Sequence, residues 1–233
     1  MAKRKNILFP VPTISLEKVH PCFSITKFGY SRECEVVMVN RTKNLAGTTN
    51  DMESWILAVL AKHSRFIFEF GTCSGRSTYL MARNSPDDTR IVTLTLDPYQ
   101  SDVYVSAAGD LPGAMTAALN ESIYKEFVYT GTEVEKKITQ LYGDSKKLDE
   151  TPYIAKCDLI FIDGSHAYSY VKNDTEKALR MLRPGGIILW HDYASHRTTA
   201  DVFRYLNELR HHMRIGLIED TTLVAYSSGQ YQT

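Results

Sequence analysis

The chain has 233 residues, of which 43% are hydrophobic and 23% are charged, and its 27 basic residues balance 27 acidic ones. This composition is typical of a globular protein with one sizeable core, and the balanced charge argues against a nucleic-acid partner or an anionic membrane surface. No apolar run approaches the ~20 residues that cross a bilayer, and Pro10 and Pro12 interrupt the apolar stretch after the basic start. We therefore expect no membrane segment and no signal peptide. The four cysteines are scattered without a C-x-x-C pair, so we also expect reduced thiols and a cytoplasmic location.

The first 48 residues show no clear periodicity, apart from the run EVVMV at 35–39, which predicts an edge strand. We interpret residues 1–48 as an N-terminal extension that either caps the core or contacts a second subunit in a homo-oligomer. Residues 49–233 then form the functional domain. The boundary is placed where regular apolar spacing begins.

The regular pattern starts at Asn50, which is expected to cap a helix. Apolar residues follow it at helical spacing, namely Met52, Trp55, Ile56, Val59 and Leu60. Runs at 65–70, 90–96 and 157–163 predict strands, and a helix is expected from about 76 to 83. A further helix should place Val171, Thr175, Ala178 and Leu182 inward, until the PGG sequence at 184–186 ends it and a strand begins at 187–190.

The last part of the chain predicts one more helix and a hairpin. The helix is marked by Val202, Phe203, Leu206, Leu209 and Met213, and apolar runs lie on either side of Glu219 and Asp220. Continuous apolar strands that alternate with helices are typical of a parallel sheet covered on both faces. Such sheets bind ligands beyond the carboxyl ends of their strands, so functional residues are expected just after each strand.

The first strand is followed by a turn with glycines at positions 71 and 75. Glycine lets a backbone approach a ligand closely, and the free N–H groups of the next helix suit a negatively charged ligand group. Glu69 lies inside the apolar strand, where a carboxylate is costly to bury without a donor, and an amine-bearing ligand would supply one. A tight turn with an incidental carboxylate is the alternative. The spacing departs from the G-x-G-x-x-G of dinucleotide-binding proteins.

The stretch EFGTCSGRS at 69–77 resembles the first motif, E/D-x-G-x-x-x-G, of class I S-adenosylmethionine-dependent methyltransferases. LYGDS at 141–145, the long stretch at 158–186 that contains IDGSH and LRPGG, and ILWHDY at 188–193 follow in the order of that family. The resemblance covers roughly residues 50–226 and is greatest to small-molecule O-methyltransferases of the catechol and macrocin types. It implies an α/β fold: a Rossmann-like, doubly wound, mostly parallel sheet with a reversed C-terminal strand.

The same resemblance implies which residues hold the cofactor. Those assigned to its methionine end are Glu69, Gly71, Thr72, Gly75 and Ser77, and those beside the adenine are Asp144 and Ser145, with Asp163 also bordering the cofactor. The family usually places an acid for the ribose hydroxyls at the end of the second strand, where this chain has Thr95. Asp97 follows two residues later on the same side of the strand, so either residue could meet the ribose.

A second group of residues suggests a metal site. Asp163 ends one strand and His191 and Asp192 end the next, and the ends of adjacent parallel strands converge. Oxygen ligands at such a point suit Mg²⁺, and the resembling O-methyltransferases bind a divalent metal through acids at these positions. His191 replaces one of those acids, so a softer metal, or none, stays open. Hydrogen-bonded acids at strand ends are the simpler interpretation.

His166 follows Asp163 by three residues, where the resembling families place their proton acceptor. An imidazole with an ordinary pKa of about 6.5 can take a hydroxyl proton near neutrality. We therefore predict that His166 and Asp163 are catalytic, in methyl transfer to a hydroxyl of a sugar, polyketide or similar small-molecule acceptor. The alternatives are an inactive cofactor-binding protein and a hydroxylase-like reaction on the same scaffold, because a fold does not fix chemistry.

Overall fold

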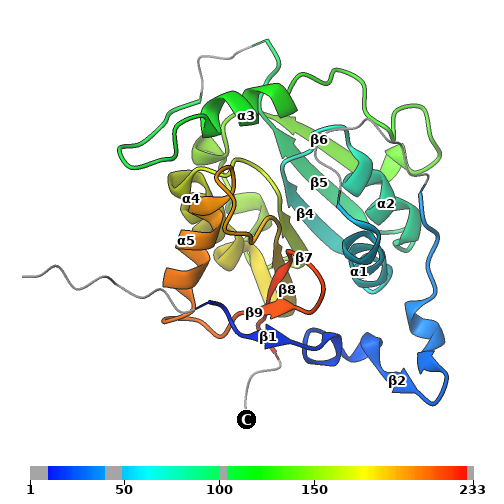
Figure 1. Cartoon of the computed structure of the whole chain (residues 1–233). Coiled ribbons are helices and arrows are strands. Elements are labelled where there is room, and N and C mark those ends of the chain that lie inside the picture. Colours follow the sequence, from blue (N-terminus) through cyan, green and yellow to red (C-terminus); the bar gives the residue numbers. More distant parts are fainter. Residues whose placement is uncertain (1–9, 40–48, 100–103, 230–233) are drawn as a thin grey trace, which may run out of the picture.

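The computed structural model describes residues 10–39, 49–99 and 104–229. Its centre is an eight-stranded sheet in the order β1-β9-β10-β8-β7-β4-β5-β6 (Figure 1). The strands are β1 (Thr13–Ile14), β4 (Phe66–Phe70), β5 (Arg90–Thr95), β6 (Ile138–Tyr142), β7 (Cys157–Ile162), β8 (Leu182–Trp190), β9 (Gly216–Ile218) and β10 (Val224–Ser227). Strands β2 (Ile25–Thr26) and β3 (Gly29–Tyr30) form a separate hairpin.

The central strands are parallel, because β4 pairs with β5 and β7, β5 with β6, and β7 with β8 in that sense. Strand β10 runs antiparallel to both β8 and β9. This topology confirms the predicted mostly parallel sheet with a reversed C-terminal strand. The apolar runs that predicted the strands are buried on both faces, as a parallel sheet requires.

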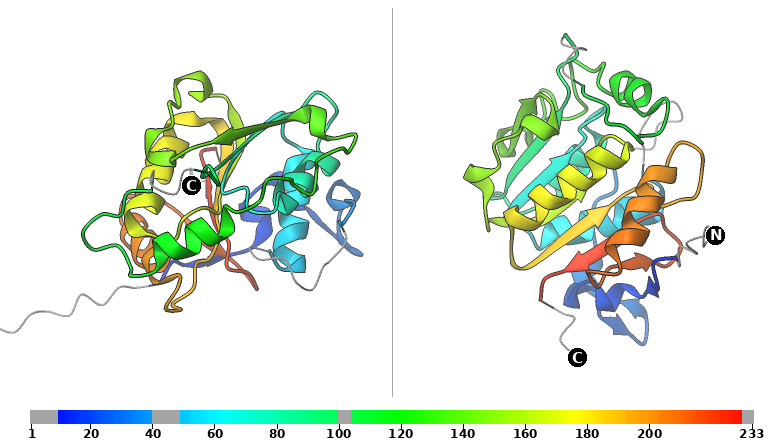
Figure 2. Two further views of the ribbon diagram at one scale, coloured as in Figure 1. Left: turned by 90° about the horizontal axis from the view of Figure 1, so that it is seen from above. Right: turned by 90° about the vertical axis from the view of Figure 1, so that its left-hand side faces the viewer.

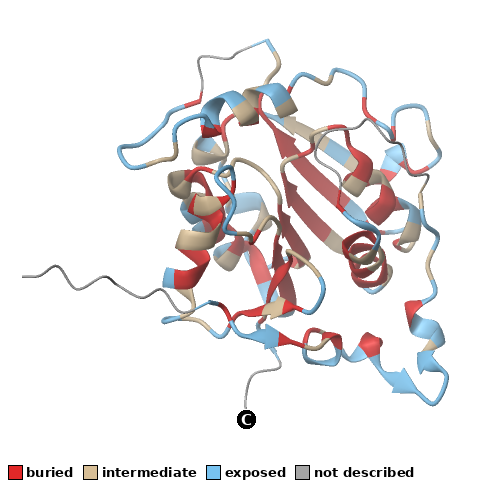
Figure 3. Ribbon diagram, in the orientation of Figure 1, coloured by how far each residue is buried: buried red, intermediate tan, exposed pale blue. Residues whose placement is uncertain are grey.

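Helices cover both faces of the sheet (Figures 1 and 2). The helices α1 (Asp51–Lys62) and α2 (Arg76–Asn84) pack on one face, and α4 (Tyr168–Met181) and α5 (Ala200–Leu209) on the other. Side chains alternate along β4, so that Ile67 packs with α1 and α2, whereas Phe68 and Phe70 pack with α4. Figure 3 shows the resulting buried sheet, and the short helix α3 (Ala114–Glu121) lies near one end of it.

Several predicted elements differ from the structure. The last helix was marked as far as Met213 but ends at Leu209, and the edge strand at 35–39 is absent. The amide side chain of Asn84, at the end of α2, occupies the backbone groups that a strand would use. Its Oδ1 accepts from the Val37 N–H at 2.7 Å, and its Nδ2 donates to the Val37 carbonyl at 2.9 Å. The strand prediction was wrong because a side chain, rather than a neighbouring strand, satisfies this segment.

A further difference is the end of α4. The helix stops at Met181, and Leu182, which was expected to be its last inward residue, instead opens β8 and pairs with Cys157. The strand then runs through the PGG sequence with a shift of register between Cys157 and Leu159. Proline disfavours helical geometry in the residue before it, so the helix ends before Arg183 rather than at Pro184.

Residues 10–39 pack on the same core as the rest of the chain. Strand β1 pairs in parallel with β9, and the side chains of Leu16, Val19 and Phe23 are buried in one cluster with those of α1. The predicted boundary after residue 48 ends a segment, 40–48, that lies outside the described residues. Among the described helices, none combines the length and the apolar character needed to cross a bilayer.

Candidate active site

The carboxyl ends of the central strands bring the predicted site residues to one edge of the sheet. The backbone ladder continues past each strand, since Gly71 N–H donates to Leu94 at 2.8 Å and Asp163 N–H donates to Phe70 at 2.8 Å. His191 N–H likewise donates to the Ile162 carbonyl at 3.0 Å. Positions 71, 163 and 191 therefore lie beside one another, as the parallel topology predicts.

A cavity of about 500 Å³, including its open mouth, lies at this edge. Its lining residues are Phe70, Gly71, Cys73, Leu94, Thr95, Leu96, Tyr104, Ala118, Glu121, Ser122, Gly143, Ser145, Asp163, Gly164, Ser165, Tyr170 and Asp174. Helix α3 and the segment at Tyr104 thus contribute walls beyond the strand ends.

Of the residues predicted to hold a cofactor, Gly71, Ser145 and Asp163 line the cavity. Sequence reasoning missed Tyr170, whose ring stacks on that of Tyr104 with centroids 4.3 Å apart. It also missed the lining carboxylates, Glu121 and Asp174. These side chains come from helices α3 and α4, and nothing in their sequence neighbourhood marks them.

The glycine turn is required by packing. Gly71 has a φ of +101°, and a Cβ there would lie 2.0 Å from the backbone oxygen of Asp163. Gly75 caps α2 in the left-handed conformation, and a Cβ there would lie 2.7 Å from the ring of Tyr129. The first glycine therefore lets two strand ends approach, and the second lets the segment containing Tyr129 cover the turn.

Glu69 does not line the cavity. Its side chain lies on the face of β4 that meets α2, and the residue is fully buried. The carboxylate accepts hydrogen bonds from Ser77 Oγ at 2.5 Å, from Thr93 Oγ1 at 2.6 Å and from Thr78 Oγ1. Hydroxyl groups thus supply the donors for which a ligand amine was expected, and the same contact turns Ser77 toward Glu69.

Thr72, another predicted cofactor residue, belongs to the polar chain that ends at Glu69. Gln140 Nε2 donates to Thr72 Oγ1 at 3.2 Å, and the Thr72 and Thr93 hydroxyls are 2.7 Å apart. Thr93 in turn donates to Glu69. The chain thus links β6, the glycine turn, β5 and β4 through side-chain hydrogen bonds.

Burial raises the pKa of Glu69 to about 7, although its hydroxyl donors oppose that rise. A carboxyl group whose folded pKa exceeds the unfolded value binds its proton more tightly when folded, so stability is lost as pH rises from about 4.5 through 7. We expect the free energy of unfolding of the wild type to fall by about 2 kcal/mol more than that of Glu69→Gln over this range. Urea unfolding of both proteins at pH 5 and pH 8 measures the difference. An equal change in the free energy of unfolding of the two proteins would contradict a raised pKa for Glu69.

The two acids assigned to the nucleoside lie outside the cavity lining. Asp97 Oδ1 accepts from the N–H of Tyr99 at 2.9 Å, whereas Thr95 lines the cavity. The buried Asp144 accepts from the N–H of Lys146 at 2.9 Å and so stabilises the turn that brings Ser145 to the cavity. Between the two residues left open for a ribose, Thr95 has the better placement.

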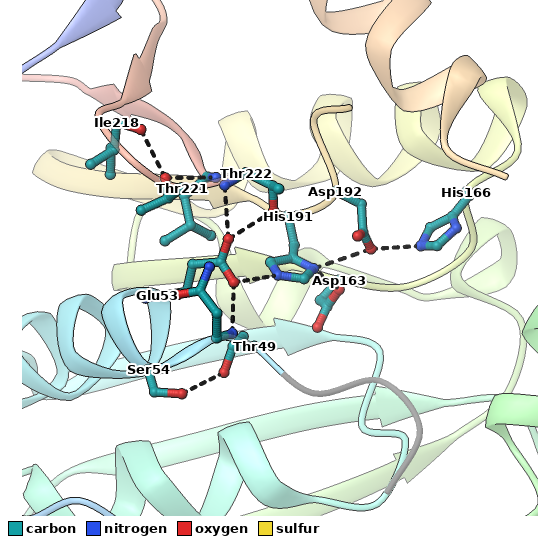
Figure 4. Close-up of polar contacts among 12 residues, drawn as sticks. Thr49, Glu53, Ser54, Asp163, His166, His191, Asp192, Ile218, Thr221 and Thr222 are labelled. Atoms are coloured by element: carbon teal, nitrogen blue, oxygen red, sulfur yellow. Dashed lines mark hydrogen bonds and ion pairs between the residues drawn. The ribbon is translucent and has the colours of Figure 1, made fainter. Parts of the chain in front are cut away.

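The second predicted group comes together closely at the other side of Asp163. Nδ1 of His191 lies 3.0 Å from Asp163 Oδ1 and 3.1 Å from Asp192 Oδ2, and His166 Nε2 lies 2.8 Å from the same Asp192 oxygen (Figure 4). Asp192 has a φ of +61°, which is uncommon for a residue with a Cβ and is typical of functional sites. We call these four residues, Asp163, His166, His191 and Asp192, the acid–histidine cluster.

The carboxylates control the charge of both histidines. Burial by itself would lower the pKa of His191, but Asp163, Asp192 and Glu53 outweigh it and raise that pKa well above the ordinary value. Burial and Asp192 oppose each other in the same way at His166, whose pKa is also raised. The pKa of Asp192 is lowered despite its burial, because both imidazoles stabilise its charged form.

Two observations indicate that the acid–histidine cluster is suited to a divalent cation. One ligand atom from each of Asp163, His191 and Asp192 lies within 4.8 Å of the others. Nδ1 of His191 is also buried and forms no hydrogen bond within the described residues, although two carboxylate oxygens are close. A buried nitrogen surrounded by oxygens, without a hydrogen-bond partner, has the arrangement of a metal ligand.

Glu53 was not predicted as part of the site, yet its Oε2 lies 3.2 Å from Nε2 of His191. The residue belongs to a capping box, in which Asn50 and Glu53 bond each other's backbone at the start of α1. The sequence shows this motif as an asparagine followed three residues later by a glutamate. It does not show that the same carboxylate reaches a histidine 138 positions away.

Comparisons with known proteins agree with this fold. A family model described as a methyltransferase domain matches residues 68–193, from β4 to the end of the acid–histidine cluster. No curated protein matches the chain in sequence.

Three solved structures are similar to the chain. The O-methyltransferase TomG from Streptomyces achromogenes, in complex with SAM, is 18% identical, with 78% of this chain and 82% of TomG covered and a TM-score of 0.53. The SAH-bound methyltransferase PaMTH1 from Podospora anserina is 19% identical, with 77% and 78% covered and a TM-score of 0.53. An O-methyltransferase from Bacillus cereus in complex with SAH is 19% identical, with 77% and 82% covered and a TM-score of 0.51.

At these identities the solved structures establish the fold, which is that of class I methyltransferases. The family model carries more weight for ancestry, because it spans over half of the chain and includes the glycine turn and the acid–histidine cluster. The chain therefore belongs to the methyltransferase-domain family.

Proposed function

We propose that the protein transfers a methyl group from S-adenosylmethionine to a hydroxyl oxygen of a small molecule. The observation that carries the proposal is the position of Asp163, which lines the cavity and is also part of the acid–histidine cluster. A cofactor in the cavity and an acceptor at the cluster would meet at this residue. Methyl transfer needs such an adjacency, because donor and acceptor atoms must be held about 3–3.5 Å apart.

The cavity supports the cofactor assignment through its shape and its walls. The Gly71 turn lets backbone border one end, and the stacked rings of Tyr104 and Tyr170 offer a flat aromatic surface for a base. Thr95, the last residue of β5, and Ser145, which follows β6, add side chains with hydroxyl groups to the lining. When bound, S-adenosylmethionine would supply an electrophilic sulfonium methyl group.

His166 is the proposed general base. Its Nε2 faces Asp192 at 2.8 Å, so an Nε2–H can donate to that carboxylate while Nδ1 accepts the acceptor's hydroxyl proton. Asp192 thereby orients the ring and stabilises the imidazolium that forms, and the raised pKa of His166 makes the imidazole a stronger base. The oxygen that loses its proton would then take the methyl group, while the S–CH3 bond breaks and the demethylated cofactor leaves as a neutral thioether.

A divalent cation, Mg²⁺ or another, is also part of the proposal. Asp163, His191 and Asp192 would hold it, and it would lower the pKa of an acceptor hydroxyl. This would reduce the work that His166 has to do. The acceptor is proposed to be a polar natural product such as a sugar or polyketide.

The N-terminal extension, residues 1–48, is proposed to be distinct from the methyltransferase domain at 49–233. Its described part adds β1 beside β9 and buries Leu16 and Phe23 against α1, which supports a role as a cap. Its hairpin exposes Ile25 and Phe28, which favours contact with a second subunit. We propose a homo-oligomer in the cytoplasm, with no nucleic-acid or membrane partner.

Isothermal titration of the protein with S-adenosylmethionine, its demethylated product and NAD⁺ tests the proposal. We expect binding of the first two and none of NAD⁺, followed by methyl transfer to at least one member of a panel of hydroxylated acceptors. Binding without turnover across that panel would favour an inactive scaffold. Absence of binding to S-adenosylmethionine would overturn the proposal.

A further inference from the structure

Glu53 is a buried carboxylate that connects three separate parts of the chain. Its Oε1 accepts from both the N–H and the hydroxyl of Thr222, at 2.8 and 2.9 Å, in the loop between β9 and β10. Its Oε2 accepts from the N–H of Asn50 at 2.8 Å and lies 3.2 Å from Nε2 of His191 (Figure 4). Donors on both oxygens hold the carboxylate in one orientation, and only 2% of the residue is exposed.

This fixed carboxylate determines which way the ring of His191 faces. A carboxylate oxygen accepts a hydrogen bond, so Nε2 of His191 carries the hydrogen that points toward Glu53. Nδ1 then faces the opposite side, toward Asp163 and Asp192. Metal-binding histidines have the same arrangement, with one nitrogen bonded to a carboxylate and the other free to bind the ion.

The distances around Nδ1 also match a metal-binding site. Two ligands at right angles and 2.1 Å from an octahedral ion are about 3.0 Å apart. Nδ1 of His191 lies 3.0 Å from one carboxylate oxygen of Asp163 and 3.1 Å from one of Asp192. Both contacts are ion pairs, and neither meets the geometry of a hydrogen bond among the described residues.

We propose that Glu53 is a positioning residue that holds His191 for metal binding, and that the site takes a first-row transition ion such as Mn²⁺ in preference to Mg²⁺. This inference depends on the proposed function only because both use the acid–histidine cluster. An imidazole nitrogen beside two carboxylate oxygens favours a first-row transition ion over Mg²⁺, because Mg²⁺ prefers oxygen ligands and keeps its own waters. Loss of the carboxylate partner of a metal-bound histidine typically costs 10- to 100-fold in metal affinity.

The test is a titration of Mn²⁺ into the metal-free full-length protein, followed by electron paramagnetic resonance of the free ion, with Mg²⁺ as a competitor. We expect the wild type to bind Mn²⁺ at least tenfold more tightly than Mg²⁺. Glu53→Gln should weaken Mn²⁺ binding by 10- to 100-fold, because the amide lacks the charge that supports His191. His191→Asp should retain a site but reduce the preference for Mn²⁺, since its ligands would then all be oxygens.

Asn50→Ala is the matched control, because it removes the side-chain half of the capping box and leaves Glu53 in place. If Glu53 acts only as a helix cap, both variants will lose stability and neither will change Mn²⁺ affinity, which would overturn the inference. Absence of Mn²⁺ binding by the wild type would overturn it as well. Titration with S-adenosylmethionine on the same samples tests the proposed function separately, because that ligand occupies the cavity rather than the cluster.

Discussion

Replacing His166 with alanine should lower the turnover number for methyl transfer by a factor of roughly 10²–10⁴, the usual contribution of a general base. Nε2 of this imidazole is held 2.8 Å from the carboxylate of Asp192. Without the ring, no positioned base takes the hydroxyl proton of the substrate. Single-turnover kinetics with saturating cofactor measure this step directly.

The exposed His211 provides a matched control, because the same substitution there removes an imidazole far from the cluster. We expect His211→Ala to retain wild-type turnover. His166 does not line the cofactor cavity, so His166→Ala should bind S-adenosylmethionine within about twofold of the wild type. Near-normal turnover of His166→Ala would remove the residue from the mechanism.

Gly71→Ala is expected to lower the free energy of unfolding by roughly 4 kcal/mol. About 1–2 kcal/mol comes from forcing a residue with a Cβ into the left-handed region, and a further 1–3 kcal/mol comes from overpacking. The overlap is with backbone, because the new Cβ would lie 2.0 Å from the Asp163 carbonyl oxygen. A rotamer change cannot relieve it, so the ends of β4 and β7 must separate.

Gly29→Ala distinguishes the two contributions. Gly29 has the same φ of +101°, but no atom lies within 4 Å of a Cβ built there. This variant should therefore lose only the conformational part, about 1–2 kcal/mol, in urea unfolding. Equal losses in the two variants would mean that the approach of β4 to β7 is not constrained at Gly71. We also expect Gly71→Ala, unlike Gly29→Ala, to lose cofactor binding.

The elements that depend on local spacing could be predicted from the sequence. Asn50 and the apolar residues after it predicted the start of α1, because a cap and a helical face are both short-range patterns. The convergence of Asp163 with His191 followed from the topology, since parallel strands end at a common edge. The run at 35–39 has strand-like composition, but its backbone bonds to Asn84 on another element. Local propensity contains no information about that partner.

The environment of single side chains was harder to infer. The sequence shows that Glu69 is a carboxylate in a buried strand and therefore needs donors. It does not show that Ser77, Thr78 and Thr93 already supply them, because the last of these lies on a different strand. Glu53 is similar: its cap is visible in the sequence, whereas its contact with His191 depends on the tertiary packing of α1 against the end of β8.

Asp163 connects the cofactor cavity to the acid–histidine cluster. Its carbonyl adjoins the Gly71 turn, and its side chain contacts His191. A ligand that shifted Asp163 from one side would also change its contacts on the other side, and the two binding sites would then be thermodynamically linked. If cofactor binding changes the affinity for the acceptor by some factor, acceptor binding changes the affinity for the cofactor by the same factor. We therefore expect any coupling between cofactor binding and acceptor binding to depend on Asp163.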